Sequence, residues 1–77
     1  MAEPDHHLDA TGLKCPLPVL RARKAMKAVE AGGVLAVDAT DPSSVQDFAN
    51  FCETTGHELL AQHEADGVYH FRIRKAG

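Results

Sequence analysis

The tetrapeptide Cys15-Pro16-Leu17-Pro18 is the part of this sequence best suited to chemistry. Proline fits the first turn of a helix because its φ is already near the helical value and its missing N–H would have no partner there. A helix that starts at Pro16 would place the Cys15 thiol at its positive end, where free N–H groups favour thiolate over thiol. The motif therefore predicts a reactive cysteine whose pKa lies below that of a free thiol.

The charged residues nearest to Cys15 in the sequence are all basic. Residues 10–29 contain no Asp or Glu, while the rest of the chain carries all eleven acidic residues and the net charge is −3. The five basic residues of this segment are Lys14, Arg21, Arg23, Lys24 and Lys27. Basic residues on a helix are often no more than a solvated face. Around a nucleophile, however, they indicate a stabilised thiolate.

Cys52 and the histidines are the other residues that could take part in chemistry. Cys52 follows Val45, Phe48 and Ala49 at helical spacing, so all four are predicted to form a buried stripe in which Cys52 packs as a small hydrophobic residue. The histidines match no zinc-binding spacing and no C-x-x-C motif accompanies them, so no metal site is predicted. They are His6, His7, His57, His63 and His70. A hydrolase that pairs a cysteine with a histidine remains an alternative, although a domain of this size offers no evident substrate cleft.

The secondary-structure pattern predicts a small α/β fold. The 77 residues allow one domain over 1–77, with residues 1–6 expected to be a flexible N-terminal tail. Apolar patterns predict strands over residues 7–10, 34–39, 58–64 and 68–74. Helical spacing predicts helices over residues 16–30 and 42–55. The order βαβαββ, with a parallel first pair of strands, leaves two helices to cover one face of four strands. A two-layer α/β sandwich follows.

Turn and cap residues mark the ends of these elements. Asp41 is predicted to be the N-cap of the second helix, with Pro42 as its first residue and Gly56 as its stop. Asp9 and Asp38, which also lie near strand ends, are likewise predicted to be cap or turn residues.

The first helix is predicted to have two apolar sides. Its core stripe consists of Val19, Ala22, Ala25, Met26 and Val29. Leu17 and Leu20 fall on the opposite side, beside Lys24 and Lys27. These leucines either form a docking surface with a basic rim or pack under the loop before the helix.

Composition argues against two classes of partner. The low aromatic content and the acidic net charge oppose direct nucleic-acid binding. No apolar run approaches the ~20 residues of a membrane span, and the polar start is unlike a signal peptide. Two distant cysteines suit a reducing compartment, so a cytoplasmic protein is expected.

Several segments together resemble a known family. They are Leu8 to Pro18, Arg23-Lys24-Ala25, Ala39-Thr40-Asp41-Pro42, Asp47-Phe48, Phe51-Cys52, Gly56-His57-Glu58-Leu59 and Ile73-Arg74-Lys75. This combination resembles the TusA-type, or SirA-like, sulfur carrier family. The resemblance implies a mixed four-stranded sheet with two helices on one face. It also implies that Cys15 carries sulfur as a persulfide, with no cofactor. The family's C-terminal Lys-Gly-Gly is Lys75-Ala76-Gly77 here, which puts a role for that tail in doubt.

The function expected from the resemblance is sulfur relay, without stand-alone enzyme activity. The donor would be a cysteine desulfurase or a rhodanese, and the acceptor a further relay protein that serves tRNA thiolation, molybdenum cofactor assembly or sulfur oxidation. Partners are expected to bind at Lys14, Pro16, Leu17, Pro18, Leu20, Arg23, Lys24 and Lys27. Two alternatives remain open: a regulatory or adaptor domain in which Cys15 is incidental, and a thiol redox or selenium-handling protein.

Overall fold

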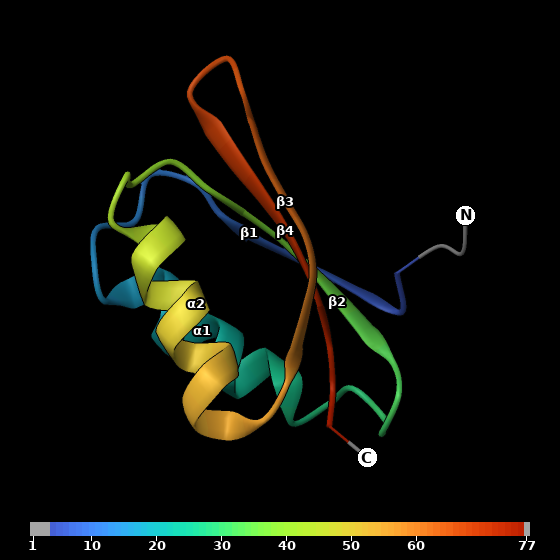
Figure 1. Cartoon of the computed structure of the whole chain (residues 1–77). Coiled ribbons are helices and arrows are strands. Elements are labelled where there is room, and N and C mark those ends of the chain that lie inside the picture. Colours follow the sequence, from blue (N-terminus) through green and yellow to red (C-terminus); the bar gives the residue numbers. More distant parts are fainter. Residues whose placement is uncertain (1–3, 77) are drawn as a thin grey trace.

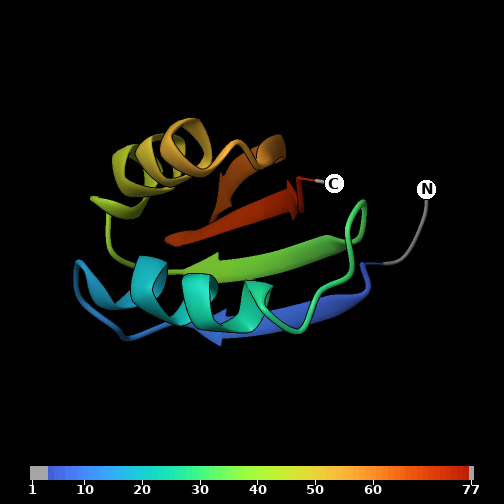
Figure 2. The same cartoon turned by 90° about the horizontal axis from the view of Figure 1, so that it is seen from below.

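The fold is a two-layer α/β sandwich, as predicted. The computed structural model describes residues 4–76. Its elements are β1 (His6–Ala10), α1 (Leu17–Met26), β2 (Val34–Ala39), α2 (Ser44–Thr55), β3 (Glu58–Ala65) and β4 (Val68–Arg74). Both helices lie on the same face of the sheet, and the other face is left uncovered (Figures 1 and 2). No helix in the described part of the chain is long and apolar enough to cross a membrane.

The sheet is mixed and its strand order is β1-β2-β4-β3. β1 pairs with β2 in parallel, whereas β4 runs antiparallel to both of its neighbours. Ala10, the last residue of β1, pairs with Ala39, the last residue of β2. The loops that follow these two strands therefore leave the sheet at the same edge (Figure 2). This register brings the Cys15 loop next to the loop that leads into α2.

The hydrophobic core lies between the helices and the covered face of the sheet. The rings of Phe48 and Phe71 pack 4.6 Å apart, centroid to centroid, and both side chains are fully buried. Cys52 is buried beside them, as predicted. Ala49 was also expected in this stripe, but it is exposed, and Phe51 is buried instead. Ala49 lies about 100° around the helix from Phe48, on the edge of the stripe, so the larger Phe51 ring takes the buried place.

α1 is shorter than predicted at both ends. It begins at Leu17 with Pro16 as its N-cap residue, and it ends at Met26 although a helix to Glu30 was expected. The chain then tightens, since the N–H groups of residues 27–29 bond to carbonyls three residues earlier. Such tighter turns satisfy the last carbonyls of a helix. Val29 is buried as expected, but it lies in this turn and not in the helix.

The two sides of α1 are as predicted. Ala22 and Met26 are buried, and Val19 and Ala25 are partly buried against the core. Leu17 and Leu20 keep 44% and 52% of their surface exposed. The alternative that these leucines pack under the preceding loop is therefore wrong.

α2 starts two residues later than predicted. Ser43 is its N-cap residue, and Asp41 lies outside the helix as a turn residue. The Asp41 carboxylate accepts a hydrogen bond from the Ser43 N–H, and the Asp41 carbonyl accepts bonds from the Ser44 N–H and Oγ. Gly56 ends the helix as expected, because its φ of 83° is left-handed and its N–H bonds to the Cys52 carbonyl.

The expected N-terminal tail over residues 1–6 overlaps the first strand. His6 lies in β1, and Asp5 exchanges hydrogen bonds with Val34: its N–H donates to the Val34 carbonyl and its carboxylate accepts from the Val34 N–H. These bonds extend the pairing of β1 with β2 beyond the predicted start. Residues 1–3 lie outside the described part of the chain.

Candidate functional site

Cys15 lies in the loop between β1 and α1, two residues before the helix, and is exposed. The loop is tied to the neighbouring loop by two hydrogen bonds. The Cys15 N–H donates to Asp41 Oδ2 at 2.6 Å, and the Gly12 N–H donates to Thr40 Oγ1 at 2.8 Å. Both contacts follow from the parallel pairing of β1 with β2. The backbone of the cysteine is thus held in place while its sulfur stays accessible.

The Cys15 thiol is in contact with a carboxylate. Its Sγ donates a hydrogen bond to Asp47 Oδ2 at 2.7 Å. This bond, some loss of hydration and the negative charges of Asp47 and Asp41 raise the pKa of Cys15 above its ordinary value. A carboxylate close to a thiol disfavours the thiolate. The prediction that the pKa of Cys15 is lowered is therefore contradicted.

The helix start supplies few of the N–H groups on which that prediction depended. Pro16 and Pro18 have no N–H, and the N–H of Leu17 is bonded to the Lys14 carbonyl at 2.8 Å. The two prolines at the helix start thus remove two of the donors that could stabilise a thiolate. The basic residues of α1 do not replace them, because none is among the groups that shift the pKa of Cys15.

Asp47 was not predicted as a site residue. It lies in the first turn of α2, 32 positions from Cys15 in the sequence. An acidic residue in the first turn of a helix is common because it interacts favourably with the helix dipole. Its position alone therefore carries no signal for a contact with sulfur, and only the packing of the two loops brings it to Cys15.

Most of the residues expected to bind partners are exposed, in the Cys15 loop, along α1 and at its C-terminal end. The exposed residues are Lys14, Pro16, Leu17, Leu20, Arg23, Lys24 and Lys27. Pro18 is buried, so it supports the helix start and cannot offer its ring to a partner. The guanidinium of Arg23 lies 5.4 Å from the centre of the Phe51 ring, which anchors this side chain across the two helices.

Two shallow hollows are lined by residues close to Cys15. One, of about 330 Å³, is formed by Gly12, Leu13, Lys14, Thr40, Asp41 and Pro42. The other, of about 210 Å³, runs between the helices and is formed by Pro16, Val19, Arg23, Asp47, Asn50, Phe51 and Thr54. Both are open to solvent, so they suit contacts with a partner protein better than enclosure of a small substrate.

Cys52 takes no part in this site. It is only 7% exposed and belongs to the hydrophobic core, and burial raises the pKa of its thiol. Its predicted role as a small core residue is confirmed. Cys15 is thus the accessible one of the two cysteines.

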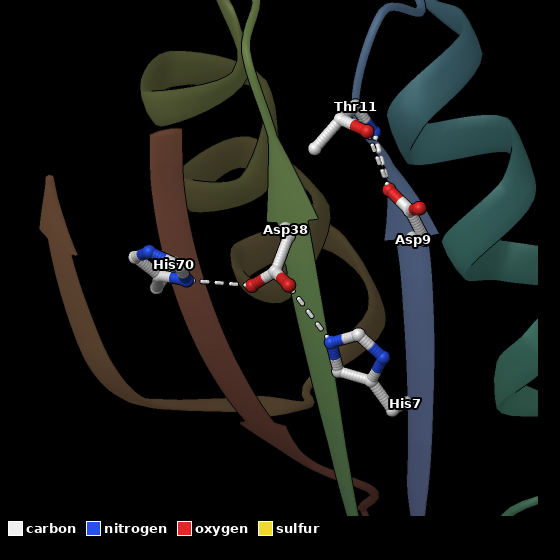
Figure 3. Close-up of polar contacts among 5 residues, drawn as sticks. All are labelled: His7, Asp9, Thr11, Asp38 and His70. Atoms are coloured by element: carbon white, nitrogen blue, oxygen red, sulfur yellow. Dashed lines mark hydrogen bonds and ion pairs between the residues drawn. The ribbon is translucent and has the colours of Figure 1, made fainter. Parts of the chain in front are cut away.

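Three of the histidines gather on the uncovered face of the sheet, away from the core. Asp38 binds His7 Nε2 at 2.8 Å through Oδ2 and His70 Nδ1 at 2.6 Å through Oδ1 (Figure 3). The His63 ring stacks on the His70 ring with centroids 4.8 Å apart. Within residues 4–76, no group of three or more His, Cys, Asp or Glu side chains is arranged to hold a metal ion.

The three aspartates predicted to be cap or turn residues differ in role. Asp9 is a turn residue, since its carboxylate accepts bonds from the Thr11 N–H and hydroxyl (Figure 3), and these lower its pKa. Asp41 is also a turn residue. Asp38 lies inside β2 and instead joins two histidines. Burial opposes its charge, but the hydrogen bonds from His70 and His7 outweigh burial and lower the pKa of Asp38.

Comparison with known proteins agrees with this arrangement. Residues 6–75 match the family model described as sulfurtransferase TusA. The sulfur carrier protein TusA of Allochromatium vinosum is 53% identical over 99% of this chain and all of its own length. The protein of the same name from Pseudomonas entomophila is 54% identical over 92% of this chain and 89% of its own.

A solved structure supports the fold independently. The crystal structure of a SirA-like protein from Desulfitobacterium hafniense superposes with a TM-score of 0.81. It is 35% identical in sequence and covers 94% of this chain and 99% of its own. The chain belongs to the TusA, or SirA-like, family.

Proposed function

We propose that this protein is a sulfur carrier that accepts sulfur as a persulfide on Cys15 and relays it to an acceptor protein. The observation that carries the proposal is that Cys15, in the Cys-Pro-x-Pro motif, is exposed while Cys52 is buried in the core. The relatives that are more than half identical are named sulfur carrier proteins. A thiol that exchanges sulfur with other proteins has to be reachable by their sulfur atoms.

The transfer needs only sulfur atoms and a proton. Cys15 Sγ attacks the outer sulfur of a donor persulfide R–S–SH, and the S–S bond of the donor breaks with its electron pair on R–S⁻. The proton lost by Cys15 neutralises that leaving thiolate. Sulfur moves from one thiol to another without net oxidation or reduction, so the step requires no cofactor and no metal. Delivery to an acceptor thiol repeats the same exchange in the other direction.

The partners follow from the family and from the surface around Cys15. A cysteine desulfurase or a rhodanese would be the donor, and a downstream relay protein the acceptor, in a pathway such as tRNA thiolation or sulfur oxidation. We expect a cytoplasmic location, because a reducing compartment keeps the Cys15 thiol free for this exchange. Leu17 and Leu20, exposed beside the basic side chains of α1, would meet an apolar contact with an acidic rim on the partner.

Sulfur loading of the cysteine variants tests the proposal. We expect incubation with a cysteine desulfurase and cysteine to add sulfur mass to the wild type and to Cys52→Ser, but not to Cys15→Ser. Intact mass and peptide mapping give the readout. Sulfur found on Cys52 in Cys15→Ser at the wild-type level would overturn the assignment.

The exposed leucines favour one second candidate, a regulatory or adaptor domain that binds proteins without using its thiol. The two functions differ in their need for Cys15. An adaptor would keep its partner binding after alkylation of Cys15, whereas a carrier would lose sulfur transfer completely.

A further inference from the structure

The contact between Cys15 and Asp47 is unexpected in a sulfur carrier. The thiolate is the nucleophilic form of cysteine, and a neighbouring carboxylate disfavours it. Yet the Cys15 thiol donates directly to Asp47 Oδ2, at 2.7 Å. The contact joins the reacting atom itself to a side chain of the other helix. We therefore expect Asp47 to affect the reactivity of Cys15 and not only the stability of the fold.

The other charges that face Cys15 do not cancel this effect. Asp41, in the loop before α2, binds the Cys15 N–H and adds a second negative charge close to the sulfur. Lys14 is next to Cys15 in the chain, but its charge acts on Asp41. Within the described residues, the side chains whose charges act on the thiol are thus both carboxylates.

We propose that Asp47 holds Cys15 as a thiol in the free carrier and thereby sets the pH at which Cys15 accepts sulfur. The part of this proposal that concerns sulfur acceptance by Cys15 rests on the proposed function. During acceptance the Cys15 S–H bond breaks, a bond forms to the outer sulfur of R–S–SH, and the donor S–S bond breaks. The electron pair stays on R–S⁻, which takes up the released proton. The products are the Cys15 persulfide and R–SH, so atoms, charge and oxidation states balance.

This arrangement gives the free carrier a protected sulfur. A thiol reacts far more slowly than a thiolate with oxidants and alkylating agents, even when it is exposed. The same pairing also preserves nucleophilicity, because the thiolate of a high-pKa thiol is intrinsically more reactive than that of a low-pKa thiol. Cys15 would therefore be slow when free at neutral pH and strongly nucleophilic once its proton is lost.

The rate of alkylation by iodoacetamide, measured against pH, tests the proposal. In the wild type we expect the midpoint to lie above the ~8.5 of a free cysteine. Asp47→Asn keeps the shape of the side chain but removes its charge, so its midpoint should be lower. For each unit of that shift, the rate at neutral pH should rise about threefold and the rate on the alkaline plateau should fall about threefold. The rate of sulfur acceptance from a desulfurase should follow the same displaced profile.

Two further variants separate this role from a structural one. Asp66→Asn makes the same charge change in the turn between β3 and β4 and should leave the midpoint where it is in the wild type. Asp47→Glu retains a carboxylate and should keep the midpoint above the free-cysteine value. If Asp47 only supported the start of α2, Asp47→Asn would lower the unfolding temperature without moving the midpoint.

Two results would overturn the proposal: a wild-type midpoint at or below the free-cysteine value, or a midpoint in folded Asp47→Asn equal to or above that of the wild type. The first needs no variant, so the proposal is decided even if Asp47→Asn does not fold. Failure of the proposed function looks different. In that case the wild type would take up no sulfur on Cys15, while the alkylation profiles would still report on Asp47.

Discussion

The Asp38 carboxylate links three adjacent strands, because it lies on β2 and binds His7 on β1 and His70 on β4. Burial disfavours its charge, but the hydrogen bonds from His70 and His7 prevail and hold the pKa of Asp38 below its ordinary value. A carboxyl group with a lowered folded-state pKa stabilises the fold above its unfolded pKa. That contribution is lost as the pH falls through the folded-state value.

We therefore expect Asp38→Asn to lower the unfolding temperature at pH 7 and to have a smaller effect at pH 3, where the stabilising contribution of the carboxylate is reduced. The side chains of its partners His7 and His70 are 55% and 36% exposed, so solvent screens both contacts and the loss at pH 7 should not exceed about 1 kcal/mol. Thermal unfolding of the wild type and of Asp38→Asn at the two pH values measures this difference in stability, with Asp66→Asn as a control for net charge. A difference in unfolding temperature that is larger at pH 3 than at pH 7 would contradict this role of Asp38.

α1 separates stability from partner binding because its two sides face different surroundings. Met26 is 3% exposed in the core, whereas Leu20 is 52% exposed. We expect Met26→Ser to destabilise the domain by about 2–5 kcal/mol, since it removes buried apolar volume. Leu20→Ser should change stability by no more than about 0.5 kcal/mol but slow sulfur transfer. Transfer rate and thermal unfolding of both variants decide this, and the reverse pattern would refute the docking surface.

The basic side chains of α1 should act on the rate of association. Opposite charges on two partners speed their encounter, and salt screens this attraction over about 10 Å at 0.1 M. We expect the double variant Lys24→Glu, Lys27→Glu to slow sulfur transfer at low salt and to weaken its salt dependence. Alkylation of Cys15 by a small neutral reagent should be nearly unchanged. Equal salt dependence in both proteins would mean that these lysines are only a solvated face.

The molecule as a whole depends on a small core. Phe48 and Phe71 join α2 to the sheet, and both are buried completely. A domain of this length has a free energy of unfolding of roughly 4–12 kcal/mol. Phe71→Ala should remove about 3–5 kcal/mol of this and lower the unfolding temperature by more than about 10 °C. Circular dichroism during heating gives the answer, and Leu60→Ala, at a position 42% exposed, should remain close to the wild type.

The sequence alone determined the elements of this protein. The strands over 34–39 and 68–74 lie where they were predicted, because burying one face of the sheet requires a local apolar pattern. The end of α2 at Gly56 could also be predicted from the sequence, since the residue after a helix often has a left-handed φ, which suits glycine. The burial of Cys52 also followed from helical spacing alone. Spacing placed Leu17 and Leu20 opposite the core stripe, but only the structure decided that they are exposed.

Only the tertiary structure decided the electrostatic surroundings of the site. The segment around Cys15 is basic in sequence, yet the charges that meet its sulfur and its backbone come from Asp47 and Asp41, 32 and 26 positions away. The same holds for Asp38, whose partners His7 and His70 lie on neighbouring strands. Coulomb energies depend on distance in space. The parallel pairing of β1 with β2 sets those distances, and no local pattern of charges reveals them.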